Sequence, residues 1–292
     1  MKKIAFAVLC LMLITVGLVM TVGDVNAQGG NTAAIALGGK LYDTWWKVVP
    51  GATEPTTDHP LWALQTTNTR KGAETWRCKE CHGWDYKGVE GAYGSGSHET
   101  GFPGVLKAGQ TKTIAELEGI LKGAANPKHD FSTVLDAASI TNLATFLKEG
   151  LIDNAQYIDY SSKKPVGGDA ARGKEKFDGT CANCHGATGT DLNFGTEQEP
   201  EYVGTIATDN PLEFLHKVRA GQPGAKMPSA IESGWSMQDV VDVLAYAQQL
   251  SLEAPKALPA TGGARTGIPL IMTGLLGFLL LAGGSALRRI AA

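Results

Sequence analysis

The chain has 292 residues, of which 43% are hydrophobic and 19% charged, and its formal net charge is -3. This length favours two domains over one large core, and the ordinary composition excludes wholesale disorder and a polytopic membrane protein. A pI of about 6.1 argues against a nucleic-acid partner held through phosphate contacts. Five cysteines are too few for a disulfide-rich scaffold.

Residues 1–27 are typical of a secretory signal peptide. Two lysines form a basic start, an apolar stretch follows over 4–22, and small residues at 25–27 offer a cleavage site. The apolar stretch is longer than usual, so an uncleaved anchor helix is the alternative. Cys10 lies inside this stretch and is expected to be removed with the signal peptide. A secretory signal places the rest of the chain outside the cytoplasm.

Residues 28–152 are predicted to form a first helical domain around a Cys-x-x-Cys-His motif at 78–82. The segment 38–46 predicts an opening helix, but some thirty residues separate it from the motif. Either these residues are an insertion, or 71–76 is a shortened opening helix. Apolar residues at helical spacing predict a helix that begins near 114 and a closing helix over 138–148. The polar segment 153–168 is interpreted as an inter-domain linker.

Residues 169–252 repeat this order around a second Cys-x-x-Cys-His motif. The predicted elements are a short helix at 170–177, the motif at 181–185, a helix at 211–219, a Met-Pro turn at 221–228 and a closing helix at 236–250.

The C-terminal end predicts a tether. Residues 253–262 form a stalk that ends in Leu258-Pro259-Ala260-Thr261-Gly262, and 263–292 hold an apolar run with a basic tail. The run is long enough to span a bilayer, and its trailing arginines favour the cytoplasmic side. This order resembles the cell-wall sorting signal of sortase substrates, which implies cleavage between Thr261 and Gly262. A plain C-terminal membrane anchor is the alternative, and both place the protein at the cell surface.

The two Cys-x-x-Cys-His motifs carry the chemistry. The pattern is that of c-type haem attachment, in which the two thiols form thioethers with the haem vinyl groups and the adjacent histidine binds the iron. A redox dithiol needs no histidine, and a zinc site would need both distant pairs together. We therefore expect two covalently bound haem c groups. The proposed thioether and proximal residues are Cys78, Cys81 and His82, and Cys181, Cys184 and His185.

Residues 169–252 resemble a class I cytochrome c domain over their whole length. The resemblance implies an all-α fold wrapped around the haem, with His185 as proximal and Met227 as distal iron ligand. Met237 is the other methionine of this region, but it lies at the start of the closing helix, where core packing explains it better. His216, in the middle of a helix, is interpreted as a surface or packing residue.

The first domain lacks a methionine, and at a constant offset of 98 residues His129 occupies the place of Met227. We therefore predict His129 as the distal ligand of a bis-histidine first haem. His98 is the second candidate and His59 the third, and an open sixth position is the remaining alternative.

These features predict an all-α, surface-tethered dihaem cytochrome c that transfers electrons from a low-potential bis-His haem to a higher-potential His/Met haem. Without its two ends the chain has a net charge near -7, so we expect redox partners with a basic docking face. An enzymatic role is the less favoured interpretation. It would be a dihaem oxidoreductase, similar to a peroxidase or a thiosulfate dehydrogenase, with an open or displaceable site on the first haem.

Overall fold

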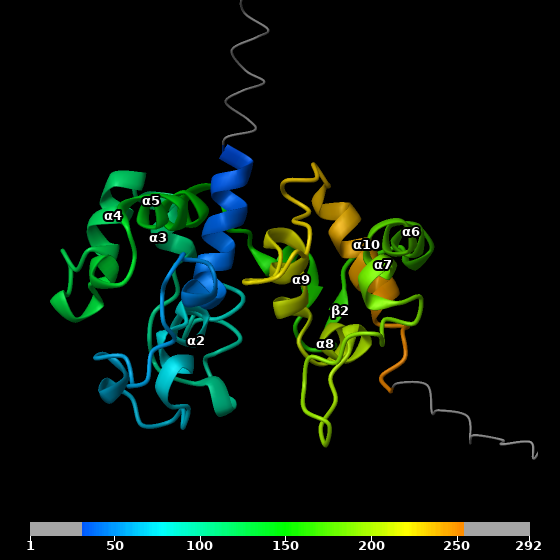
Figure 1. Ribbon diagram of the computed structural model, residues 1–292, viewed down its shortest axis with the longest axis horizontal. Coiled ribbons are helices and arrows are strands. Elements are labelled where there is room, and N and C mark those ends of the chain that lie inside the picture. The colour runs from blue at the N-terminus through cyan, green and yellow to red at the C-terminus, as the bar shows by residue number, and fades with distance from the viewer. Residues whose placement is uncertain (1–30, 254–292) are drawn as a thin grey trace, which may run out of the picture. The chain divides into compact units, whose positions relative to one another are not determined.

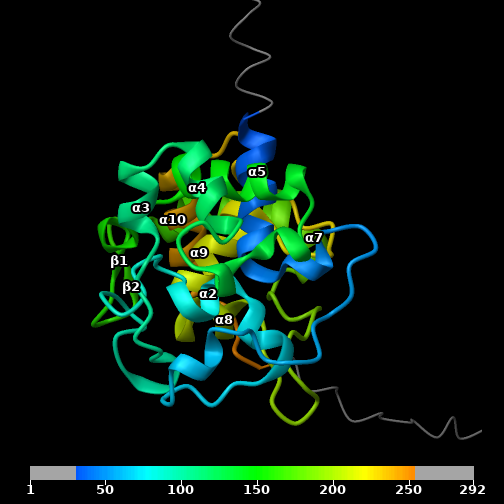
Figure 2. The same cartoon turned by 90° about the vertical axis from the view of Figure 1, so that its left-hand side faces the viewer.

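The computed structural model describes residues 31–253, all within one compact unit (Figures 1 and 2). The predicted signal peptide, the LPATG motif and the anchor helix lie outside the described residues. The described part is mostly helical, as predicted, and its two strands, β1 (Ile158–Asp159) and β2 (Lys164–Pro165), pair antiparallel. Within residues 31–253 no helix is long and apolar enough to cross a bilayer.

The first region begins with a helix over residues 31–44. It continues with α2 (Cys78–His82), α3 (Leu106–Thr111), α4 (Ile114–Leu121), α5 (Ala137–Thr145) and a π-helical turn, η7 (Phe146–Gly150). Thr113 and Glu116 form a capping box at the start of α4, and the Asp136 carboxylate caps α5. The two helices predicted near 114 and over 138–148 are confirmed.

The second region contains α6 (Ala170–Lys176), the π-helical turn η9 (Phe177–Cys181), α7 (Ala182–His185), α8 (Val203–Asp209), α9 (Pro211–Ala220) and α10 (Met237–Ala247). Ser236 caps α10 in a capping box with Asp239, so the predicted closing helix is confirmed. The sequence reading missed α8, whose seven residues are too few to show a helical period.

Short 3-10 helices connect these elements. They are η1 (Trp45–Lys47), η2 (Trp62–Leu64), η3 (Gly72–Trp76), η4 (Gly96–His98), η5 (Pro127–His129), η6 (Phe131–Thr133) and η8 (Asn154–Gln156).

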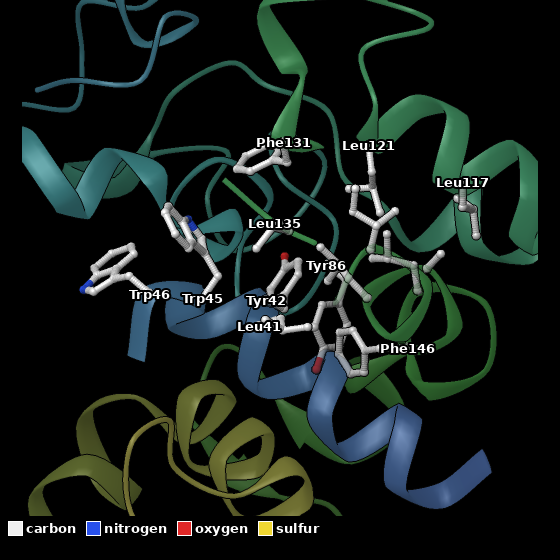
Figure 3. Packing of buried hydrophobic residues seen from close by; sticks show 14 residues of the cluster. Leu41, Tyr42, Trp45, Trp46, Tyr86, Leu117, Leu121, Phe131, Leu135 and Phe146 are labelled. Atoms are coloured by element: carbon white, nitrogen blue, oxygen red, sulfur yellow. The ribbon is translucent and has the colours of Figure 1, made fainter. Parts of the chain in front are cut away.

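Each region has its own hydrophobic core. In the first core Tyr42, Tyr86 and Phe146 lie together, with ring centroids 5.5 to 5.9 Å apart (Figure 3). The second core contains Phe177, Leu215 and the apolar face of α10, and it includes Cys181 and Met227 as partly buried neighbours. Both cores therefore lie against a Cys-x-x-Cys-His segment.

A glycine brings the opening and closing helices into close contact in both regions. A Cβ atom on Gly38 would overlap the Asn142 carbonyl oxygen of α5, and one on Gly173 would overlap the Asp242 carbonyl oxygen of α10. Any larger residue would force the helices apart. The shared crossing identifies the helix over 31–44 as the opening helix of the first region.

This crossing decides between the two sequence interpretations of the segment before the first motif. Residues 47–77 are an insertion of turns and 3-10 helices, and 71–76 contain only η3. The segment 153–168, interpreted as a linker, is folded: β1 and β2 pair there, and Ile158 is buried in the second core.

Candidate functional site

Helix α2 places the first cysteine pair and its histidine on one short turn. Cys78 and Cys81 are three residues apart and so lie on the same helical face. Gly83 ends the helix with φ +79°, and its carbonyl accepts a 2.7 Å hydrogen bond from the Tyr42 hydroxyl. Both thiols are free, and burial raises the pKa of each to about 12. They are protonated at neutral pH, unlike the thiols of a redox dithiol site.

His129 lies opposite His82 across the first site. Their ring centroids are 6.2 Å apart, with planes inclined by 76°. Two imidazoles that bind one metal ion from opposite sides, each through a bond of about 2 Å, have centroids at roughly this separation. The separation would therefore allow both imidazoles to bind one metal ion placed between them.

Backbone carbonyls orient both imidazoles. The Nδ1 atom of His82 donates to the Pro103 carbonyl at 2.7 Å, and that of His129 donates to the Ile120 carbonyl at 3.4 Å. These bonds place the proton on Nδ1 and leave the Nε2 lone pair free to bind a metal. Burial lowers the pKa of His129 and takes that of His82 to about 4, so both rings are neutral, as metal ligands must be.

The loop after α4 holds His129 in place. Gly123 turns the chain with φ +80°, and the Asn126 side chain caps η5, which ends at His129. A β-bridge between Lys122 and Asp130 closes this loop across its base. The local sequence thus fixes the position of the histidine in the first site.

The two other candidate ligands of the first region are placed differently. His98 stacks on Tyr93 and lies 3.3 Å from the Glu80 carboxylate through Nδ1. His59 lies closer, 6.4 Å from the His129 ring, but its Nδ1 accepts the Leu61 backbone N–H at 3.2 Å. In neutral His59 the proton therefore lies on Nε2, which blocks metal binding through that atom.

The side chains of the first site border a common pocket that opens to solvent. Its lining includes both thiols, the two opposed histidines and the aromatic rings of Trp76 and Phe131. An apolar wall with two thiols and two neutral imidazoles is a donor set that fits a covalently attached haem.

A buried ionic network locks the two middle residues of the first motif. The Glu80 carboxylate is fully buried and accepts hydrogen bonds from Lys79 at 2.7 Å and Asn68 at 2.9 Å. Arg70 and His98 each lie 3.3 Å from it. Burial alone would raise the pKa of Glu80, but hydrogen bonds from His98 and Lys79 and the Lys79 charge hold it well below its usual range. The insertion is thereby tied to α2.

The second site has the same local fold, but no carbonyl among the described residues orients its histidine. Gly186 ends α7 with φ +74°, as Gly83 ends α2. The His185 Nδ1 atom is buried without a hydrogen-bond partner among the described residues. Cys184 is exposed, whereas Cys181 and Met227 are half-buried against the second core. An orphaned imidazole beside two thiols fits haem attachment here as well.

Residues 168–246 match the family model described as Cytochrome C oxidase, cbb3-type, subunit III. The match identifies this segment as a cytochrome c domain and supports the prediction of a c-type cytochrome. The helical fold agrees with it. The cytochrome c family implies covalently bound haem c and haem-based electron transfer. No curated protein and no solved structure gave a match.

The sequence reading missed the groups that orient the ligands and that join the two regions. The carbonyls of Pro103 and Ile120 carry no sequence signal, because every residue has one. Asp43 and Trp84 are buried. Their only sequence signal is their position, Asp43 in the opening helix and Trp84 just after the first motif. His216, interpreted as a surface or packing residue, is buried between the two regions.

Proposed function

We propose that the protein is a dihaem cytochrome c that carries single electrons between extracytoplasmic redox partners. One haem c would be attached through Cys78 and Cys81 in the first region, and the other through Cys181 and Cys184 in the second. The common helix order, the glycine crossings and the positive-φ glycines after both motifs support two cytochrome c-like domains in tandem.

The His82–His129 pair is the observation that carries the proposal. Both faces of a haem in the first site would be closed by side chains whose orientation is fixed by backbone carbonyls. A closed iron exchanges electrons but binds no substrate, which favours a carrier over an enzyme. In the second site His185 and Met227 are the proposed axial ligands.

The two ligand sets predict a direction of electron flow. Bound haem supplies one-electron chemistry, and its potential depends on the axial ligands. The thioether sulfur of Met227 favours ferrous iron, whereas a second imidazole, from His129, lowers the potential. Electrons should therefore enter at the first site and rest at the second.

We also propose a location and a partner. The LPATG motif, with Leu258, Pro259, Thr261 and Gly262 as its defining residues, supports attachment to the cell wall or, failing cleavage, to the membrane. The acidic charge of the external portion supports partners with a basic docking face.

Carbon monoxide binding to the reduced protein tests the proposal. A carrier with two six-coordinate haems binds no carbon monoxide, whereas an oxidoreductase with an open first haem binds it. Substituting His129→Ala should turn the first haem high-spin and let it bind carbon monoxide, while the second haem's spectrum stays unchanged. His98→Gln is the matched control and should leave both spectra as they are. An unchanged spectrum in His129→Ala contradicts the ligand assignment.

A further inference from the structure

Helix α9 forms a wall of both haem regions. One face places Leu215 and Val218 in the second core, against which Cys181 and Met227 also pack. The other face is directed at the first region, where Arg219 donates a 2.7 Å hydrogen bond to the Gly150 carbonyl. The helix over 31–44 lies alongside this face (Figure 1).

The helices are close enough here that only a glycine fits. A Cβ atom on Gly39 would lie 2.6 Å from the Ala220 Cβ atom of α9. Neither atom belongs to a flexible side chain, so any larger residue would push α9 away from the first region.

His216 extends from α9 into the first region, where both of its ring nitrogens form hydrogen bonds. Its Nε2–H donates to the Gly39 carbonyl at 2.9 Å, so its Nδ1 accepts from the Tyr86 hydroxyl, also at 2.9 Å. Burial lowers the pKa of His216 to about 4, in agreement with a neutral ring. The imidazole therefore has a fixed tautomer and no free nitrogen.

Trp84 is the residue of the first region that meets this imidazole. It follows the proposed ligand His82 by two positions, it is 1% exposed, and its ring centroid lies 4.9 Å from that of His216. Arg77, Lys79 and Lys217 place their charges 5.4 to 5.9 Å from the centre of the indole ring. A π system thus lies between the first motif and α9.

Asp43 fastens the two regions at the same place. Its fully buried carboxylate forms ion pairs with Arg77, the residue before the first motif, and with Lys217 of α9 at 2.7 Å. Two cations from different regions that share one buried anion resist separation, because parting them would leave charge uncompensated.

We propose that α9 couples the two haem regions and that an electron crosses between them at the Trp84–His216 contact. This inference rests on the proposed dihaem function. The step moves one electron and no atom, so that one iron is oxidised from ferrous to ferric as the other is reduced. Because the electron passes from one iron to the other and rests on neither side chain, Trp84 and His216 keep their charge and no proton needs to move.

Inter-haem electron transfer in the full-length dihaem protein tests this assignment. Flash reduction of the oxidised protein with less than one electron per molecule populates the first haem, and the two haem spectra then report transfer to the second. Trp84→Leu should lose the fast transfer phase, and Trp84→Phe, which keeps an aromatic ring, should retain it. Trp62→Leu removes a similarly buried indole of the first region away from α9 and should also retain it.

A second variant keeps the test decisive if Trp84→Leu fails to fold. Gly39→Ala pushes α9 outward without touching a proposed ligand and should slow the transfer. Gly119→Ala, where the nearest atom lies 3.8 Å from the new methyl group, should not. Unchanged transfer in Trp84→Leu or Gly39→Ala, with two six-coordinate haems present, overturns the inference alone. A mass that shows one haem, or carbon monoxide binding by the reduced wild type, overturns the proposed function instead.

Discussion

The two regions share an order of helices and differ at the loop that carries the proposed distal iron ligand. In the first region a loop histidine faces His82, and carbonyls orient both rings. In the second region the same loop position carries Met227, and His185 has no such carbonyl partner among the described residues. If both regions hold haem as proposed, one scaffold would carry two ligand sets, and a single loop residue would set the difference in potential.

Exchanging that loop residue should have the largest effect on the difference between the two potentials. In His129→Met a thioether replaces an imidazole, so the first haem's potential should rise by on the order of 0.1 V or more toward that of the second. A redox titration that shows two waves in the wild type should then approach a single wave. Two unchanged waves would mean that His129 binds no iron.

The reverse exchange, at Met227, should change the potential of the second haem. Met227→His should lower the second haem's potential by a similar amount, on the order of 0.1 V, and so remove most of the driving force between the haems. The same titration measures it, with Met237→Leu as the control. Met237 lies at the first position of α10, and its loss should leave both waves in place.

The buried Asp43 carboxylate, which pairs with Lys217 across the two regions, should contribute most to the stability of their contact. Burial alone would raise the pKa of Asp43, but the charges of Lys217 and Arg77 hold it well below its usual range. Asp43→Asn leaves those cations without their shared anion and should cost about 3–5 kcal/mol of unfolding free energy. Denaturant titration measures this loss. Asp136→Asn, an exposed cap that asparagine can replace, is the control, and an equal loss in both variants would contradict the assignment.

A substitution at the helix crossing of the second region should change the unfolding free energy by a smaller amount, and its sign can be predicted. Gly173→Ala improves helix propensity but overlaps the Asp242 carbonyl, so we expect a net loss of about 1–3 kcal/mol. Gly119→Ala has the same propensity gain, its methyl group makes only an ordinary contact with Ala124, and it should be stabilising by about 0.5–1 kcal/mol. Thermal unfolding of the two variants decides it. A shift of the same sign in both would mean that the crossing tolerates a methyl group.

The sequence was sufficient to predict the closing helices and to single out His129, whose ring lies near that of His82. These features are local, because they depend on fixed spacing and on capping residues such as Ser236. The segment between 47 and 77 gave no such signal, since its 3-10 turns have no apolar period.

The contact between the regions could not be predicted for a different reason. His216 and Tyr86 are 130 positions apart, and Asp43 and Lys217 are 174 apart. A lone histidine on an amphipathic helix has the same local pattern whether it faces solvent or a second domain. Only the tertiary arrangement distinguishes the two, so the sequence interpretation of His216 as a surface or packing residue was incomplete.

The hairpin between the two regions should show the smallest effect, confined to acid. The hydroxyls of Ser161 and Ser162 and the Ser161 backbone N–H lower the pKa of Asp159 to about 2. Because its pKa is lower in the folded state, Asp159 stabilises the fold above its ordinary pKa, and this contribution fades as the pH falls from about 4 to 2. The difference between the melting temperatures at pH 6 and pH 2.5 should therefore be slightly smaller for Asp159→Asn than for the wild type. An identical pH response in both would show that the Asp159 carboxylate does not stabilise the folded hairpin through these hydrogen bonds.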